Sequence, residues 1–234
     1  MIPNIFNIVP QALQICNQPI SEMEIKNKES LNSLFGQKPM KDDAKIRAFR
    51  LMKGKTSWLE IGTETKLNLA YMSTILSEDA LVIDIDIAKN EEGTKKLKDF
   101  AAFQLHQIIN SSNNVDTVRA TQKILNNKKI DGIFIDGNHM YEFVFNDFVY
   151  YNKFVKDNGY IFFHDIFYTG NQKSKGVFQC LDYINRWIPV YQVYGNAPVS
   201  RFKPMPNNDI IWGGVAIIRM KDLLAYKYKL QAQQ

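Results

Sequence analysis

From residue 57 onward, short apolar runs alternate with segments whose apolar residues are spaced three or four apart. Continuous apolar runs between helices are typical of strands that are buried on both faces of a parallel sheet. Spacing of three or four indicates helices with one face on the core. This alternation therefore predicts an α/β protein with a doubly wound, mostly parallel sheet.

The predicted sheet has seven strands. They are expected at residues 57–62, 80–86, 106–110, 132–136, 159–164, 190–194 and 210–218. Helices are expected between them at residues 66–77, 91–104, 115–126, 141–156 and 175–187. No helix separates the last two strands, only a Pro-containing loop at 195–209, so we expect these strands to pair antiparallel at one edge.

Residues 1–55 differ from the rest of the chain. Short helices are predicted at 10–20, 22–35 and 42–51, divided by Pro-containing joints. We therefore divide the chain into an N-terminal helical extension (1–55) and a main domain (56–234). Additions on a rigid scaffold often carry specificity, so the extension and loop 195–209 are expected to cover the carboxyl edge of the sheet.

Composition excludes several classes of protein. Apolar residues make up 45% and charged residues 23%, which is an ordinary globular mixture. The net charge of +5 comes from scattered basic residues, which disfavours a nucleic-acid partner. No apolar run is long enough to span a bilayer and no basic leader begins the chain, so we expect neither a membrane partner nor a signal peptide. Cys16 and Cys180 lack a CxxC spacing, which favours buried thiols and a cytoplasmic location.

Polar side chains gather at the predicted carboxyl ends of the strands, where open α/β sheets bind their ligands. They are Glu60, Gly62, Asp84, Asp86, Ser111, Ser112, Asp136, His139, His164 and Asp165. A carboxylate about twenty residues after a glycine turn, like Asp84, is where ribose hydroxyls are usually held. A helix cap or a solvated strand end would also explain Asp84, and a plain strand–helix junction would explain the single glycine.

The passage from Trp58 to Asp165 resembles class I S-adenosylmethionine-dependent methyltransferases. It is most similar to the branch of macrocin O-methyltransferase-like and cephalosporin hydroxylase-like proteins. The resemblance is carried by WLEIGT (58–63), VIDID (82–86), DGIFIDGNHMYE (131–142), Asp147 and GYIFFHD (159–165). It implies that residues 56–234 form a Rossmann-like methyltransferase domain whose cofactor is S-adenosylmethionine.

The resemblance also implies roles for the strand-end residues. Gly62 would line the methionine portion of the cofactor, Asp84 would bind the ribose, and Ser111 and Ser112 would lie beside the adenine. Glu60 and Asp136 join this cofactor-binding set. Where the glycine loop continues in relatives, this chain has Glu64 and Lys66, with Lys66 expected to offset the repulsion of Glu64.

In relatives that use a metal, the corresponding ligands are Asp136, His164 and Asp165, with Mg²⁺ or Mn²⁺ as the cation. A histidine in the set favours Mn²⁺ over Mg²⁺. Two unpaired carboxylates at neighbouring strand ends would repel, and a cation resolves this conflict. His139 corresponds to the base that accepts the hydroxyl proton, although a loop role for His139 and an indirect role for His164 stay open.

These features predict an O-methyltransferase that acts on a hydroxyl of a sugar or other small metabolite. The alternative is a catalytically inactive binding or assembly protein of the same fold, which the altered glycine loop favours. A nucleic-acid or protein methyltransferase is disfavoured, because the Asn/Asp-Pro-Pro-Tyr/Phe type of motif is missing after the fourth predicted strand. The sequence leaves the acceptor, the metal and a homo-oligomer open.

Overall fold

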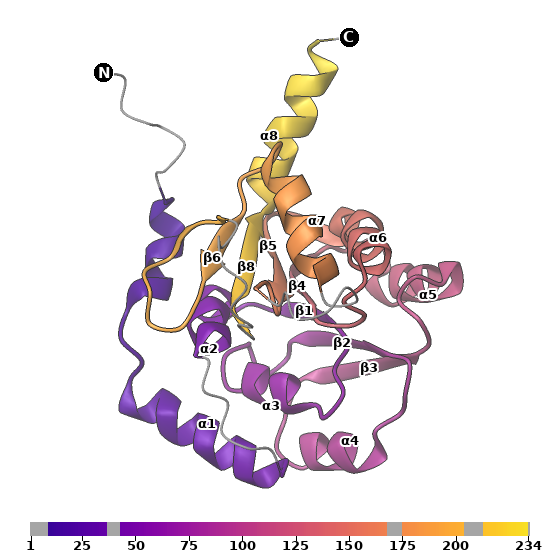
Figure 1. Ribbon diagram of the computed structural model, residues 1–234. Helices are drawn as coiled ribbons and strands as arrows, with labels where there is room; N and C mark the ends of the chain where they lie inside the picture. Colours follow the sequence, from indigo (N-terminus) through magenta and orange to yellow (C-terminus); the bar gives the residue numbers. More distant parts are fainter. Residues whose placement is uncertain (1–8, 37–42, 168–174, 204–212, 234) are drawn as a thin grey trace.

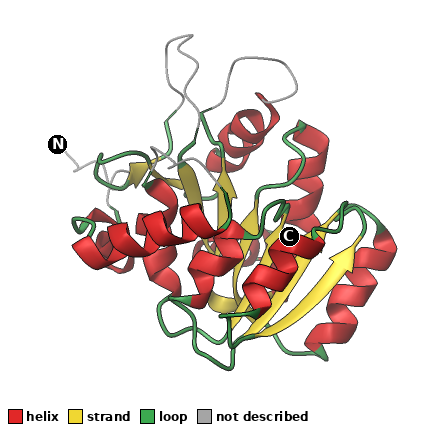
Figure 2. Cartoon of the chain, turned by 90° about the horizontal axis from the view of Figure 1, so that it is seen from below, coloured by secondary structure: helices red, strands yellow, loops and turns green. Residues whose placement is uncertain are grey.

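The computed structural model describes residues 9–36, 43–167, 175–203 and 213–233. In these residues a single sheet has eight strands in the order β3-β2-β1-β4-β5-β8-β6-β7, with helices on both faces (Figures 1 and 2). Strands β1 to β5 pair in parallel, and β8 pairs antiparallel with both β5 and β6. The predicted doubly wound, mostly parallel sheet with an antiparallel edge is confirmed.

The bounds of the elements are as follows. The strands are β1 (Ser57–Ile61), β2 (Leu81–Asp86), β3 (Gln104–Ile109), β4 (Ile130–Ile135), β5 (Val155–His164), β6 (Tyr191–Val193), β7 (Ser200–Arg201) and β8 (Val215–Arg219). The α-helices are α1 (Glu22–Leu34), α2 (Ala44–Phe49), α3 (Leu67–Ser73), α4 (Glu91–Lys98), α5 (Val115–Leu125), α6 (Tyr141–Tyr151), α7 (Lys175–Asn185) and α8 (Met220–Gln231). Short 3-10 helices are η2 (Gln11–Asn17), η3 (Arg50–Met52) and η4 (Asn152–Phe154).

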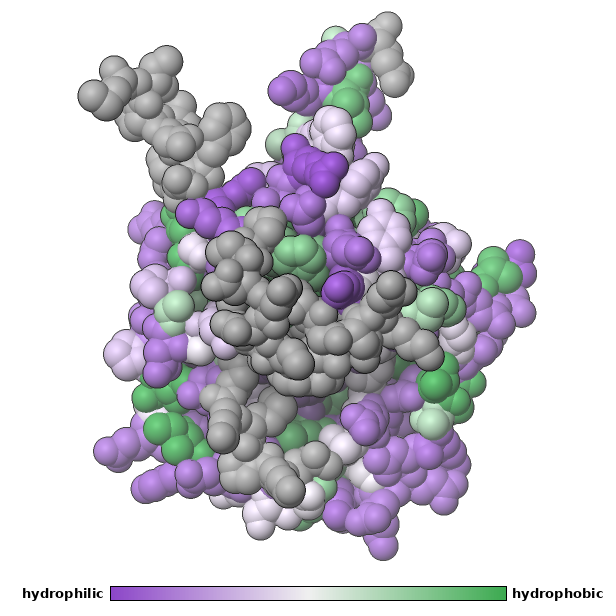
Figure 3. Space-filling model, viewed as in Figure 1, coloured by the Kyte–Doolittle hydropathy of each residue, from purple (hydrophilic) through white to green (hydrophobic). Residues whose placement is uncertain are grey.

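The helices predicted at 91–104 and 141–156 are shorter than expected, and β5 already begins at Val155. Two further elements were not predicted. The two-residue strand β7 pairs with β6 inside the segment expected to be a loop, so the described residues hold eight strands where seven were predicted. Helix α8 follows the last strand and was not predicted. Lysines and tyrosines alternate along it, so its few apolar residues show no clear helical spacing. Only Met220 and Leu223 of α8 are buried. Its C-terminal half extends away from the sheet, and its surface there is mostly hydrophilic (Figures 1 and 3).

Alternation along the strands separates two hydrophobic cores. In β4, Ile133 and Ile135 face the core that contains apolar residues of α5, α6, α7 and α8. Phe134 between them faces the core that contains residues of α3, α4 and the N-terminal segment. Because successive strand side chains point to opposite faces, one strand can serve both cores.

The N-terminal segment packs on one face of the sheet. The Phe49 ring of α2 lies edge-on to the rings of Trp58, Phe134 and Phe162, with centroids 5.3, 5.1 and 5.9 Å away. Arg47, on the same helix, donates hydrogen bonds to the backbone oxygens of Gly195 and Ala197. The segment before residue 55 and the start of loop 195–209 are therefore joined. A division of the chain at residue 55 stays a prediction, and residues 204–209 lie outside the described residues.

The remaining sequence expectations concern the membrane and the cysteines. Among the described residues, no helix is both long and apolar enough to cross a bilayer. Cys16 and Cys180 are free thiols and fully buried, as predicted.

Candidate active site

A cavity of about 640 Å³ lies at the carboxyl ends of the parallel strands. The residues that line it come from the ends of β1, β2 and β5, from the loops after β1 to β5 and from helices α2, α3 and α6. Its lining includes Lys45, Gly62, Thr63, Glu64, Asn68, Asp86, Asn110, Ser111, Ser112, Asp136, Gly137, Asn138, His139, Phe143, His164 and Asp165. Of the predicted site residues, Gly62, Ser111, Ser112, Asp136, His139, His164 and Asp165 therefore share one cavity.

Gly62 is required by the close approach of two loops. Its φ is +82°, and a Cβ at this position would lie 2.3 Å from the backbone oxygen of Asp136 and 2.5 Å from Cα of Gly137. Hydrogen bonds from the backbone N–H of Gly62 to Ile85 and of Asp136 to Ile61 hold the strand ends together. The loop after β1 is thus seated directly on the loop that carries Asp136.

Asp84 does not line the cavity. Its carboxylate is fully buried and forms an ion pair with the equally buried Lys66, at 3.0 Å. It also accepts hydrogen bonds from Thr63 Oγ1 at 2.6 Å and Gln107 Nε2 at 2.8 Å. The prediction that Asp84 binds the ribose does not agree with this geometry. Lys66 is committed to Asp84, so it does not offset Glu64 at the cavity either.

Asp86, two residues further along β2, faces the cavity instead. Its Oδ2 accepts hydrogen bonds from the backbone N–H of Thr63 at 3.0 Å and of Glu64 at 2.8 Å. Burial raises the pKa of Asp86, but hydrogen bonds from backbone N–H groups outweigh it and the net pKa is lowered. Asp86 is therefore a fixed carboxylate at the cavity wall. The VIDID run contains both aspartates, and the sequence does not show which of the two side chains reaches the cavity.

Glu60 also lies outside the cavity. It is fully buried, its Oε1 accepts a hydrogen bond from Asn68 Nδ2 at 3.0 Å, and burial raises its pKa to about 7. The predicted role of Glu60 in direct cofactor contact is therefore not supported by its position. Its contact with Asn68 places it behind the cavity wall.

Ser111 and Ser112 follow β3 at the far side of the cavity. The backbone oxygen of Ser112 accepts a hydrogen bond from the Tyr151 hydroxyl at 2.8 Å. Asp147 of α6 accepts one from Asn113 Nδ2 at 2.7 Å, and burial raises the pKa of Asp147 to about 7. Helix α6 thus holds the loop that presents the two serines.

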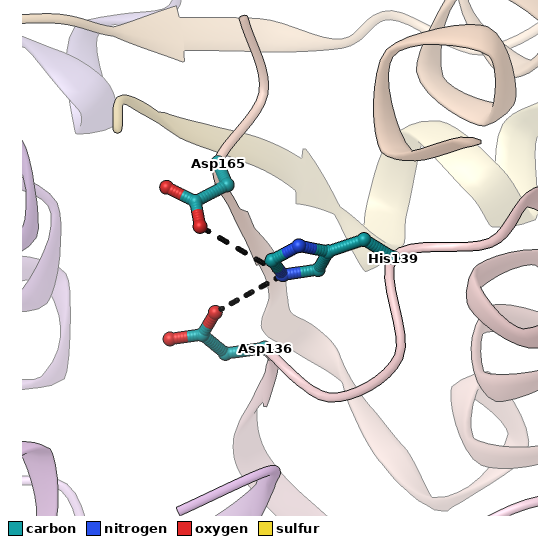
Figure 4. Close-up of side chains that lie close together, drawn as sticks. All are labelled: Asp136, His139 and Asp165. Carbon is teal, nitrogen blue, oxygen red and sulfur yellow. Dashed lines mark ion pairs between the residues drawn. The ribbon is translucent and has the colours of Figure 1, made fainter. Parts of the chain in front are cut away.

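Asp136, His139 and Asp165 converge at one end of the cavity (Figure 4). Nε2 of His139 lies 3.7 Å from Oδ1 of Asp136 and 3.8 Å from Oδ2 of Asp165. This nitrogen is buried and makes no hydrogen bond within the part of the chain that the structure describes. The close approach of Asp136 raises the pKa of His139. One ligand atom from each of the three residues lies within 4.8 Å of the others, so the set fits a divalent cation.

His164 also lines the cavity and lies beside the same two carboxylates. Its Nδ1 is 3.1 Å from Oδ1 of Asp136 and 3.3 Å from Oδ1 of Asp165. Burial lowers the pKa of His164, but the charge of Asp136 and the hydrogen bonds to Asp136 and Asp165 together outweigh it, and the net pKa is raised. The grouping that could hold a metal contains His139 where the sequence analysis named His164.

Lys45 is a cavity residue that sequence reasoning missed. Its Nζ lies 3.1 Å from Oδ2 of Asp136 and 3.3 Å from Oδ1 of Asn68. It also lies over the ring of Phe134, 5.3 Å from the centroid. Ninety-one positions separate Lys45 from Asp136 in the chain, and no motif links them. Only the packing of α2 on the sheet brings the two together.

The loop that carries His139 is also held from the side of α7. A Cβ at Gly176 would lie 2.3 Å from the backbone oxygen of His139 and 2.2 Å from the backbone nitrogen of Tyr141. Gly176 therefore packs backbone against backbone on this loop.

Asp165 has a φ of +52°, a conformation that is uncommon for a non-glycine residue and often marks a functional position.

Comparisons with known proteins agree with this geometry. Residues 59–166 match a family model described as a methyltransferase domain. The fold is similar to that of the O-methyltransferase TomG from Streptomyces achromogenes, at 13% identity over 92% of each chain and a TM-score of 0.53. It is also similar to an O-methyltransferase from Bacillus cereus (12% identity, 91% of this chain and 92% of that one, TM-score 0.51). An rRNA methylase from Streptococcus thermophilus shares the fold too (7% identity, 86% and 98%, TM-score 0.51). No curated protein has a matching sequence.

Proposed function

We propose that this chain is an S-adenosylmethionine-dependent O-methyltransferase of a small hydroxyl compound, because residues 59–166 match a family model described as a methyltransferase domain and the fold is similar to that of solved O-methyltransferases. The observation that carries the proposal is the His139 imidazole, which lines the cavity and whose buried Nε2 lies between two carboxylates without a hydrogen bond to any described group. A nitrogen in this setting is suited to accept a proton from a bound hydroxyl.

Cofactor binding is proposed for the side of the cavity formed after β1, β2 and β3. S-adenosylmethionine would supply an electrophilic methyl group on a sulfonium. Asp86 would accept hydrogen bonds from the ribose hydroxyls, Gly62 would let the backbone approach the methionine portion, and Ser111 and Ser112 would border the adenine. Isothermal titration calorimetry with S-adenosylhomocysteine tests this directly. Absence of binding at millimolar ligand would remove the main support for the enzyme.

Proton acceptance is proposed for the opposite side, at His139. When Nε2 accepts the hydroxyl proton, the imidazolium that forms lies beside the carboxylates of Asp136 and Asp165, which stabilise its charge. The acceptor oxygen is then more nucleophilic toward the methyl group. In this proposal the cofactor that carries the methyl group binds on one side of the cavity, and His139 accepts the proton on the other.

A metal-assisted version of the same reaction uses the same nitrogen differently. A divalent cation held by Asp136, His139 and Asp165 would screen the acceptor oxygen, and Mn²⁺ suits this nitrogen-containing set better than Mg²⁺. His139 Nε2 cannot be a metal ligand and a proton acceptor at once. Loss of transfer on chelation, with recovery on adding Mn²⁺, would favour the ligand role. Unchanged transfer after chelation would favour the base.

A second candidate function is that of an inactive binding protein with the methyltransferase fold. It is favoured by Glu64, whose exposed side chain borders the cavity while Lys66 is engaged elsewhere. A carboxylate here would repel the carboxylate of the cofactor. Glu64→Gln should then strengthen S-adenosylhomocysteine binding several-fold. Weak S-adenosylhomocysteine binding by the unmodified chain, together with no transfer to phenol, catechol or sugar probes, would support this candidate.

We further propose a small-molecule acceptor, no nucleic-acid partner and a cytoplasmic location. The support for the first two is the scattered distribution of the basic residues, which forms no continuous stripe in the sequence. The support for the third is the reduced state of two buried cysteines. Equal transfer to a small phenol with and without ribosomal RNA present would agree with this choice of acceptor.

A further inference from the structure

Two carboxylates close together need positive charge beside them, or one must take up a proton. Asp136 and Asp165 end up together because β4 and β5 are neighbours in the sheet and both run toward the cavity. A metal ion is one answer to this requirement. The structure shows a second answer that the chain itself provides, on helix α2.

The Lys45 ammonium is fixed by three contacts. Its Nζ lies 3.1 Å from Oδ2 of Asp136, 3.3 Å from Oδ1 of Asn68 and 5.3 Å from the centroid of the Phe134 ring. The Lys45 side chain is only 11% exposed, and that of Asp136 is 14% exposed. Asn68 cannot turn away freely, because its Nδ2 donates to the buried carboxylate of Glu60. The ammonium therefore has a defined position in the cavity wall.

The two oxygens of Asp136 are already divided between partners. Oδ2 contacts Lys45, while Oδ1 faces His164 at 3.1 Å and His139 at 3.7 Å. A divalent cation could then use only Oδ1 of this residue. It would also lie within a few ångströms of a fixed ammonium, beside side chains that are mostly buried, where like charges repel more strongly than in water.

We propose that Lys45 is the resident cation of this cluster, and that its ammonium keeps the affinity for divalent metals low. With Lys45 as counter-ion of Asp136, Nε2 of His139 is left available as the proton acceptor. The effect of Lys45 on metal affinity does not depend on any reaction. The role of His139 as proton acceptor rests on the proposed methyl transfer. Lys45 would act through Asp136 and is thus a positioning residue contributed by the N-terminal segment.

Mn²⁺ titration tests the proposal without any need for an acceptor. Binding of Mn²⁺ to the full chain can be followed by electron paramagnetic resonance of the free ion and by calorimetry. Lys45→Met removes the charge and keeps the length of the side chain, whereas Lys45→Arg keeps the charge. Lys129→Met is a matched control, because it removes a lysine that pairs with Asp157 at 3.1 Å on the surface before β4.

We expect Lys45→Met to bind Mn²⁺ at least about tenfold more tightly than the unmodified chain, because a fixed positive charge beside the site is gone. Lys45→Arg and Lys129→Met should bind as the unmodified chain does. Equal Mn²⁺ affinity in the unmodified chain and Lys45→Met would overturn the proposal, and so would no binding by either. Lys45→Arg keeps the positive charge, so a gain in Mn²⁺ affinity in this variant could not come from loss of charge. Such a gain would also overturn the proposal.

Calorimetry with S-adenosylhomocysteine on the same samples keeps the two proposals apart. Loss of this binding in every sample would contradict the proposed function and leave the Mn²⁺ result valid. Normal S-adenosylhomocysteine binding with unaltered Mn²⁺ affinity would contradict only the role of Lys45. Binding by Lys45→Met also confirms that the variant is folded.

Discussion

Two lysine–aspartate pairs lie near the carboxyl ends of β2 and β4. They differ in whether a ligand in the cavity can reach them. Lys66 pairs with Asp84 of β2 at 3.0 Å, and both side chains are fully buried. Lys45 pairs with Asp136 after β4 at 3.1 Å, and both side chains line the cavity. The chemistry of the two pairs is the same, and their position decides what each can do.

The buried pair is closed to ligands. All its described partners are protein groups, and Asp84 is held by Thr63 and Gln107 as well as by Lys66. The cavity pair instead keeps one carboxylate oxygen directed at His139 and His164. A charged residue at a strand end is thus a functional candidate only when it reaches the cavity. Asp86 does and Asp84 does not, although two positions separate them.

The largest effect is expected at the cavity pair, on the rate. His139→Ala removes the proton acceptor beside Asp136 and should lower the rate of methyl transfer by about 10²–10⁴-fold, while S-adenosylhomocysteine affinity stays nearly unchanged. Single-turnover kinetics and calorimetry would measure both. The matched control is His106→Ala, because His106 is exposed on β3. A His139→Ala variant with full activity would remove the base assignment.

At the buried pair the effect should appear in stability. Lys66→Met leaves the Asp84 carboxylate buried without its counter-ion, which should lower the free energy of unfolding by about 3–5 kcal/mol. The double variant Lys66→Met/Asp84→Leu should recover much of this loss, because no charge is then left uncompensated. Urea denaturation followed by circular dichroism would measure it. Equal stability of the single variant and the unmodified chain would mean that the pair contributes little.

The two aspartates of β2 give a third contrast. Asp86→Asn should weaken S-adenosylhomocysteine binding by about 1.5–3 kcal/mol, because a charge-assisted hydrogen bond to the ligand is lost. Asp84→Asn should lower stability and change this affinity by less than about twofold in the folded protein. Calorimetry on both variants, with thermal denaturation alongside, separates the two outcomes. The reverse pattern would restore Asp84 as the ribose-binding residue.

The smallest effect is expected from pH. His139 must be neutral to accept a proton, and Asp136 raises its pKa, so the rate should rise with pH through an inflection above the ordinary histidine value. The stability contribution of a raised pKa is complete below the unfolded-state value and is lost as pH rises through the folded-state value. Rate and stability should therefore change in opposite directions over this range. Asp136→Asn should move the rate inflection to lower pH, and an unchanged inflection would assign it to another group.

Much of the fold followed from periodicity. The seven predicted strands correspond to observed ones, although residues 210–212 of the last prediction lie outside the described residues. The antiparallel edge followed from the missing helix between the last two predicted strands, and β6 does pair antiparallel with β8. Periodicity did not reveal α8, because the apolar residues of this helix make few buried contacts. Nor did it reveal β7, which is too short to show a pattern.

The sequence predicted the site residues that lie at strand ends. It did not predict which side chains are buried away from the cavity, or which residues far apart in the chain come into contact. Asp136, His139 and Asp165 were found because parallel strands bring their carboxyl ends to one edge. The choice between Asp84 and Asp86 needed the depth of each side chain relative to the cavity. The contact of Lys45 with Asp136 needed the packing of a helix from another part of the chain.

The two glycines that contact the loop after β4 have a consequence for redesign of the site. Gly62 and Gly176 contact the backbone of this loop, at Asp136–Gly137 and at His139–Tyr141, so no larger residue fits at either position without moving the loop. Directed evolution toward new acceptors should therefore retain both glycines in nearly every active clone. Asn138 lines the cavity, but its Oδ1 accepts a hydrogen bond from the backbone N–H of Met140 at 2.9 Å, just before α6. A library at this position is therefore safest when it is limited to residues such as Asp and Ser, whose side chains can accept the same hydrogen bond.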